Sequence, residues 1–176
     1  MIRGGKGGGN TITGLNFEKE RDILALLKKT PGYSIDGHVI SYNKKEVARS
    51  YRKGSLYKFL ASKGVNYSEI LSKKLLPDEA LYVVVNNTMY IIELKFQRVA
   101  GSVDEKLQTC DFKKRQYQRL FAPLNYEVEY VYILSDWFNK PEYKDVLTYI
   151  ISVGCQYYFK YLPLQKLGLP VPAVKQ

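Results

Sequence analysis

The segment from residue 81 to residue 92 constrains the fold of this chain more than any other. Two apolar stretches, 81–85 (Leu-Tyr-Val-Val-Val) and 89–92 (Met-Tyr-Ile-Ile), flank the dipeptide Asn86-Asn87. β-Branched and aromatic residues favour strands, and asparagine tolerates the positive φ angles of a tight hairpin turn. The sequence therefore predicts two antiparallel strands joined by a two-residue loop.

This loop length sets the register of the charged residues at the open end of the hairpin. It places Asp78 opposite Lys95, and because side chains alternate along a strand, Glu93 shares their face while Leu94 points to the other. The carboxylates of Asp78 and Glu93 then occupy diagonal positions, about 7–8 Å apart at the backbone. A three-residue loop would instead bring Glu79 opposite Glu93. Burying these charges without partners costs several kcal/mol, so they face an opening, pair with one another or bind a metal ion.

The sequence after the hairpin predicts a parallel crossover. Ser102 and Glu105 form a capping box that opens a helix, whose apolar residues recur at spacings of three, four and seven as far as Phe121. A strand at 126–134 follows, and a strand–helix–strand order favours a right-handed parallel connection. Further elements are expected as a strand at 39–42, a helix at 141–152 and a strand at 156–161. The predicted fold class is α/β, with a mixed β-sheet and flanking helices.

The remaining segments suggest one domain with extensions. At 176 residues and 20.3 kDa the chain has the size of a single domain, which we place at 14–161. Residues 1–13 form a glycine-rich basic arm, and a first helix is expected at 14–29, capped by Thr13. A basic helical insert is expected at about 44–72. The proline-containing tail, 162–176, is either disordered or packed as a strap on another surface.

Charge favours a polyanionic partner. The chain has 27 Lys and Arg against 17 Asp and Glu, a net charge of +10 and a pI near 9.4. Nucleic acid ranks ahead of an acidic membrane, because no basic helix has a clean apolar face. The alternative is that the lysines only keep the surface soluble. No apolar run is long enough for a membrane span and no signal-peptide pattern opens the chain, so we expect a cytoplasmic protein.

Several classes of chemistry are excluded by what the chain lacks. Cys110, Cys155 and the single His38 are too few for a four-ligand zinc site, and two cysteines do not make a disulfide scaffold. No GxSxG nucleophile elbow is present. Catalysis would depend on carboxylates, lysines or a hard metal ion.

The pair Pro77-Asp78 followed by Glu93-Leu94-Lys95 resembles the PD-(D/E)xK nuclease superfamily, in which an acid precedes a strand that carries an acid, any residue and a lysine. The predicted order of helix, hairpin, helix and parallel strand is similar to that superfamily's α-β-β-β-α-β core over roughly residues 14–134. The run 93–97 (Glu-Leu-Lys-Phe-Gln), followed by 101–106 (Gly-Ser-Val-Asp-Glu-Lys), resembles small type II restriction endonucleases in particular. The insert at 44–72 departs from the simplest pattern.

The resemblance implies a Mg²⁺ site. Mg²⁺ prefers oxygen ligands, and Asp78, Glu93 and the carbonyl oxygen of Leu94 would hold it while leaving room for water and a phosphate oxygen. Lys95 would stand beside the attacking water and stabilise charge on the phosphate. Glu18, on the first helix, matches an additional acid found in many members; the alternative is a solvated surface residue. For the triad itself, the alternative is a surface salt-bridge cluster.

DNA contacts are expected from the arm, the insert and the residues that follow the Glu93-Leu94-Lys95 motif. Gln97 either orients the site or touches DNA, or is only a polar residue at a strand end. The expected DNA-binding residues are Arg3, Lys6, Lys44, Lys45, Arg49, Arg52, Lys53, Gln97, Ser102 and Lys106.

The function predicted from these features is a Mg²⁺-dependent type II restriction endonuclease that hydrolyses double-stranded DNA at a specific sequence. Because both strands are cut, we expect a homodimer with two active sites related by a two-fold axis. Two alternatives remain at this point: a structure-selective nuclease of the junction-resolvase kind, and a non-catalytic DNA-binding protein.

Overall fold

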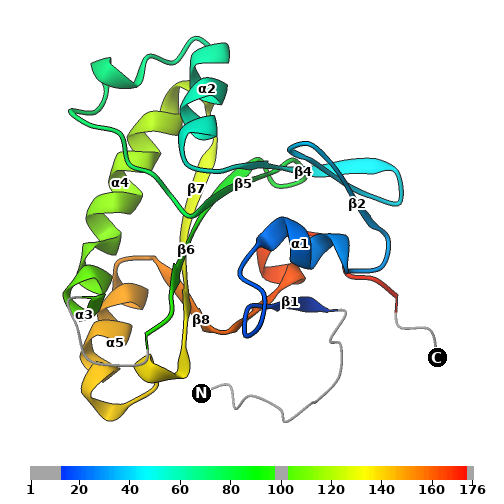
Figure 1. Ribbon diagram of the computed structural model, residues 1–176. Helices are drawn as coiled ribbons and strands as arrows, with labels where there is room; N and C mark the ends of the chain where they lie inside the picture. Colours follow the sequence, from blue (N-terminus) through cyan, green and yellow to red (C-terminus); the bar gives the residue numbers. More distant parts are fainter. Residues whose placement is uncertain (1–12, 98–102, 174–176) are drawn as a thin grey trace.

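The computed structural model describes residues 13–97 and 103–173, and it is organised around a seven-stranded mixed sheet (Figure 1). The strand order is β2-β3-β4-β5-β6-β7-β8; the strands from β2 to β6 pair antiparallel, and β6, β7 and β8 pair parallel. The predicted α/β class is confirmed. The strands are β2 (Tyr33–Asp36), β3 (Val39–Tyr42), β4 (Lys45–Tyr51), β5 (Glu79–Val83), β6 (Thr88–Lys95), β7 (Glu127–Leu134) and β8 (Gln156–Phe159).

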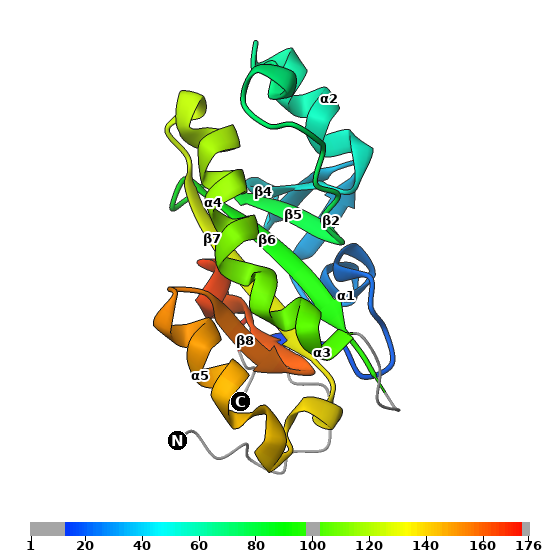
Figure 2. The same ribbon diagram turned by 90° about the vertical axis from the view of Figure 1, so that its left-hand side faces the viewer.

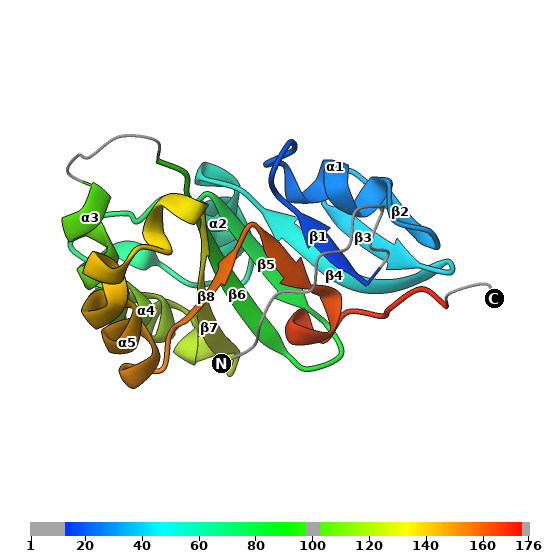
Figure 3. The ribbon, with the colours of Figure 1, turned by 90° about the horizontal axis from the view of Figure 1, so that it is seen from below.

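Each face of the sheet is covered and encloses its own core (Figure 3). One face carries α2 (Gly54–Ser62), α3 (Val103–Lys106), α4 (Cys110–Phe121) and α5 (Lys144–Ser152). The other carries α1 (Ile23–Lys28) and a two-stranded antiparallel sheet of β1 (Gly14–Asn16) and β9 (Tyr161–Pro163). The short 3₁₀ helices are η1 (Tyr67–Glu69), η2 (Leu107–Thr109), η3 (Ala122–Leu124), η4 (Asp136–Phe138), η5 (Pro141–Tyr143) and η6 (Leu164–Leu167).

The first predicted helix is shorter than expected. Residues 14–16 form β1, and α1 begins only at Ile23, because the Asp22 side chain accepts hydrogen bonds from the backbone N–H groups of Leu24 and Ala25. Asp22 is therefore the N-cap, not Thr13. Glu18 consequently lies in the loop before the helix, and the prediction that it sits on the first helix was wrong.

The expected helical insert is half strand. β4 pairs with β3 on one side and β5 on the other, so residues 45–51 are a central strand of the sheet. Only the second part of the segment is helical, as α2 and η1. Two ladders of backbone hydrogen bonds outweigh the weak helical preference of this polar sequence.

The hairpin is present, but its loop has four residues rather than two. Val83 pairs with Thr88, so residues 84–87 form the turn, and the predicted register was wrong by two residues. A shift of two preserves which side chains share a face. Continuing the observed ladder by one residue places Asp78 level with Glu93 instead of opposite Lys95.

The parallel connection between β6 and β7 is confirmed. Figure 2 shows α4 running across the face formed by these strands. The crossover helix is interrupted by η2, which separates α3 from α4. Ser102, expected as its N-cap, lies outside the described residues.

The C-terminal tail is packed rather than disordered as far as residue 173. Leu164, Leu167 and Leu169 are buried in the same core as α1, and the Tyr33 hydroxyl donates to the carbonyl oxygen of Pro170 at 2.6 Å. In the described part of the chain, every helix is too short or too polar to cross a bilayer.

Candidate functional site

Asp78, Glu93 and Lys95 meet where β5 begins and β6 ends. Asp78 is exposed just before β5, and its Oδ2 accepts a hydrogen bond from the backbone N–H of Leu94 at 2.9 Å. Glu93 is 6% exposed, and its Oε2 lies 2.8 Å from Nζ of Lys95. Strand alternation places Glu93 and Lys95 on the face covered by α4. The three residues of the predicted triad therefore lie together where β5 begins and β6 ends, and Asp78 is hydrogen-bonded to the backbone of β6.

Glu79 lies on the opposite face and belongs to a different network. It pairs with Ile92 in the ladder, and its carboxylate accepts from the Ser50 hydroxyl at 2.7 Å and from Nε of Arg52 at 2.9 Å. Arg52 also binds the Asp22 carboxylate, which joins β4 and β5 to the N-terminus of α1. The three-residue loop that would have set Glu79 opposite Glu93 is excluded by this register.

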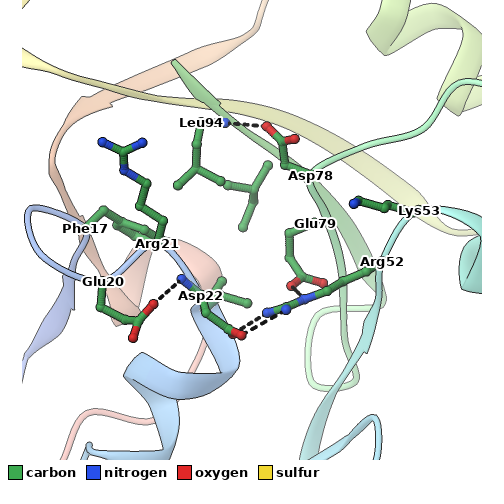
Figure 4. A pocket seen from close by; sticks show the side chains of 11 residues that line it. Phe17, Glu20, Arg21, Asp22, Arg52, Lys53, Asp78, Glu79 and Leu94 are labelled. Carbon is green, nitrogen blue, oxygen red and sulfur yellow. Dashed lines mark hydrogen bonds and ion pairs between the residues drawn. The ribbon is translucent and has the colours of Figure 1, made fainter. Parts of the chain in front are cut away.

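The network borders a cavity of about 640 Å³ beside Asp78. Figure 4 shows Asp78 and Glu79 pointing apart, toward Leu94 and Arg52 respectively, with Lys53 on the Asp78 side. Burial raises the pKa of Glu79, whereas the hydrogen bond from Arg52 lowers the pKa of Asp22. The Arg52–Glu79 pair therefore compensates a buried charge at one wall of the cavity.

Three tyrosines line the covered side of Glu93. Tyr130 and Tyr132 lie on β7, where Glu93 pairs with Tyr132 in the parallel ladder, and Tyr117 approaches from α4 with its ring centroid 6.5 Å from that of Tyr130. Burial, followed by the Glu93 charge, raises the pKa of both Tyr117 and Tyr130. These phenols therefore remain protonated hydrogen-bond donors at neutral pH.

Sequence reasoning did not select these tyrosines, although a signal was present. Val128, Tyr130 and Tyr132 alternate along the predicted strand, and a parallel neighbour of the Glu93 strand must place one alternating set beside Glu93. The Arg52 network had no comparable signal, because its members are far apart in sequence.

Glu18 and Gln97 have separate surroundings. The Glu18 carboxylate is 3.5 Å from Nζ of Lys160, which also pairs with Asp136, and Glu18 does not line the cavity beside Asp78. Gln97 lies just beyond β6, and its backbone N–H donates to the Ser135 hydroxyl at 3.1 Å. The structure thus fixes the chain at Gln97 and leaves Glu18 in an ion pair with Lys160.

The expected DNA-binding residues do not form one patch. Lys44 and Lys45 are exposed at the start of β4, whereas Arg52 and Lys53 follow its end, about 20 Å away for a strand of this length. Arg49 pairs with Glu46 at 2.6 Å, and Arg52 pairs with two carboxylates. Lys106 is exposed at the end of α3. Arg3, Lys6 and Ser102 lie outside the described residues.

The donor set suits a cation that keeps most of its own water. Among residues 13–97 and 103–173, no group of three or more His, Cys, Asp or Glu side chains is arranged to hold a metal ion. Asp78 and Glu93 supply two carboxylates, and Mg²⁺ is commonly bound through one or two carboxylates plus water and substrate oxygens. The residues present fit Mg²⁺ in that mode.

Comparisons with protein families, with curated proteins and with solved structures give no significant match.

Proposed function

We propose that this protein is a Mg²⁺-dependent endonuclease of double-stranded DNA, of the restriction type and with the PD-(D/E)xK arrangement of catalytic residues. The observation that carries the proposal is the meeting of Asp78, Glu93 and Lys95 at adjacent ends of β5 and β6. The chain contains α1, β4, β5, β6, α4 and β7 in the α-β-β-β-α-β order that the resemblance in the sequence implies, with β7 parallel to β6, and this supports the proposal. The strands β2 and β3 and the helices α2 and α3 are additions to that order.

Each member of the triad has a role that its position supports. Asp78 and Glu93, with the carbonyl oxygen of Leu94, would hold Mg²⁺, which supplies stabilisation of phosphate oxygens and acidification of water when bound. Lys95 stabilises the negative charge that develops on the phosphate, once its ammonium leaves Glu93 for the substrate. Asp78 is already held in place by the backbone of Leu94.

Charge supports DNA as the substrate. The net charge of +10 provides a long-range attraction to phosphates. Lys53 stands at the cavity beside Asp78 and forms no ion pair with another described residue, so it is available to a DNA phosphate. Cleavage of both strands at symmetric positions favours a homodimer with two active sites related by a two-fold axis.

Gel assays on duplex DNA test the proposal. With Mg²⁺ the wild type should cut, and with Ca²⁺ it should bind without cutting. Lys95→Ala and Glu93→Ala should still bind DNA but lose cleavage, whereas Lys166→Ala, an exposed lysine on η6, should cut at the wild-type rate. Cleavage of branched substrates only would favour a junction-selective nuclease. A gel-mobility shift without cleavage in Mg²⁺ would indicate a DNA-binding protein without nuclease activity.

A further inference from the structure

The hydroxyl of Tyr130 is a deeply buried polar group on β7. Tyr130 is 0% exposed, and its hydroxyl oxygen makes no hydrogen bond of acceptable geometry with any described residue. The adjacent Tyr132 hydroxyl is near enough to perturb the pKa of Tyr130, but it donates to the carbonyl oxygens of Lys106 and Leu107, at 3.2 and 3.5 Å. Buried polar groups are nearly always satisfied, so the Tyr130 hydroxyl requires an explanation.

Its surroundings point to the candidate metal site. Tyr130 pairs with Ile91 in the parallel ladder, two residues before Glu93 and on the same face. Tyr117 closes the other side, and it is close enough to both Asp78 and Glu93 for their charges to act on it. The Tyr130 side chain therefore lies on the same face of the sheet as Glu93, near enough for the Glu93 charge to act on it.

A further hydrogen-bond donor near Glu93 would help to hold the site in place during the proposed reaction. Its carboxylate is held by Lys95 at 2.8 Å, and the proposed reaction requires that lysine to turn toward the substrate. A hydrated Mg²⁺ presents ordered water molecules to its outer surroundings. Groups in that outer layer orient the ligands, and they affect metal affinity even though they do not touch the metal.

We propose that Tyr130 is a positioning residue of this site, and that its hydroxyl donates a hydrogen bond to a water molecule of the hydrated cation held by Asp78 and Glu93. The inference rests on the proposed function, because it requires the metal site. It assigns to β7 a part of the site that the Asp78, Glu93 and Lys95 motif does not contain.

The test compares Tyr130→Phe with Tyr57→Phe in the full-length protein without DNA. Both changes remove one buried hydroxyl from the core that α4 covers, but only Tyr57 loses hydrogen bonds to the backbone, with the carbonyl oxygen and the N–H of Leu75. Calorimetric titration with Mg²⁺ and Mn²⁺ should show the dissociation constant raised about 10-fold in Tyr130→Phe and unchanged in Tyr57→Phe. Thermal unfolding without metal should show the reverse: Tm unchanged or higher in Tyr130→Phe, and lower by a few degrees in Tyr57→Phe.

Glu93→Gln distinguishes a failure of the proposed metal site from a failure of the role given to Tyr130. If the wild type binds the cations, Glu93→Gln abolishes binding and Tyr130→Phe binds like the wild type, the role of Tyr130 is refuted while the metal site stands. If the wild type binds neither cation, or binding survives Glu93→Gln, the metal site fails and the inference fails with it.

Discussion

Arg52 joins α1, β4 and β5 through two carboxylates, and replacing it with methionine tests how the wall of the cavity is stabilised. The change keeps the aliphatic stem and removes the guanidinium. Among the described residues, Glu79, which is 3% exposed, would then keep the hydrogen bond from the Ser50 hydroxyl at 2.7 Å and lose the one from Arg52. A hydrogen bond to a charged group contributes about 1.5–3 kcal/mol, and the half-exposed pair with Asp22 adds at most about 1 kcal/mol.

The expected loss is about 3 kcal/mol in the free energy of unfolding at pH 7, after allowance for the partial exposure of Arg52. In a domain of this size that lowers Tm by about 6–10 °C. Urea and thermal unfolding measure it. The matched control is Arg49→Met, which breaks a pair with the partly exposed Glu46 and should cost less than about 1 kcal/mol.

The loss in the free energy of unfolding caused by Arg52→Met should be larger at neutral pH than at acidic pH. Burial raises the pKa of Glu79 above its ordinary value of 4.5, and the hydrogen bond from Arg52 opposes that rise, so the variant has the higher pKa. A carboxyl whose pKa is raised by folding destabilises the fold as the pH rises from its unfolded pKa through its folded pKa. Asp22 acts in the same direction, since Arg52 lowers its pKa in the wild type. The stability gap between wild type and variant should therefore be largest at neutral pH. The part due to Glu79 is lost as the pH falls to the folded pKa of Glu79 in the wild type, which lies above 4.5, whereas the part due to Asp22 shrinks only near and below the ordinary value of 3.8.

A second substitution locates the cause. If the penalty comes from the uncompensated charge of Glu79, the double variant Arg52→Met/Glu79→Gln should be more stable at pH 7 than Arg52→Met alone. A loss below 1 kcal/mol for Arg52→Met, or an equal loss at pH 4 and pH 8, would refute the reasoning.

Two further predictions concern packing and DNA affinity. Gly14→Ala should destabilise the protein by about 1–3 kcal/mol, because a Cβ at residue 14 would lie 2.3–2.8 Å from ring atoms of Tyr161. The control Gly54→Ala, whose Cβ would meet nothing within 4 Å, should cost little, and equal melting temperatures for the two variants would contradict this account of the packing. Deleting residues 2–9 removes Arg3 and Lys6 and should reduce the slope of log affinity against log salt concentration by up to about two, measured on duplex DNA in Ca²⁺. If the slope and the affinity stay unchanged, the arm does not contact DNA.

The sequence predicted the parts of the fold in which local pattern and tertiary pairing agree. The two apolar stretches around Asn86 became β5 and β6, and the strand–helix–strand order gave the parallel β6–β7 pair. Alternation with period two is unaffected by a shift of two residues, so Glu93 and Lys95 fell on the predicted face although the loop was two residues longer than expected.

The failures occurred where distant segments decide the structure. Residues 45–51 have no strong strand signal, and they form β4 because β3 and β5 provide partners on both sides. Residues 14–16 form β1 because the C-terminal β9 pairs with them. The ion pairs of Arg52 likewise depend on residues about 30 positions away in each direction, which no local pattern reveals.

The measurement that tests the central claim most directly is the digestion of long DNA of mixed sequence by the wild type, Asp78→Asn and Glu79→Gln in Mg²⁺, with the fragment ends sequenced. Circular dichroism on each variant establishes that it is folded. Wild type and Glu79→Gln should release the same discrete fragments with common end sequences, and folded Asp78→Asn should release none. The account is contradicted if the wild type makes no Mg²⁺-dependent cuts, or if Asp78→Asn cuts DNA while folded Glu79→Gln does not.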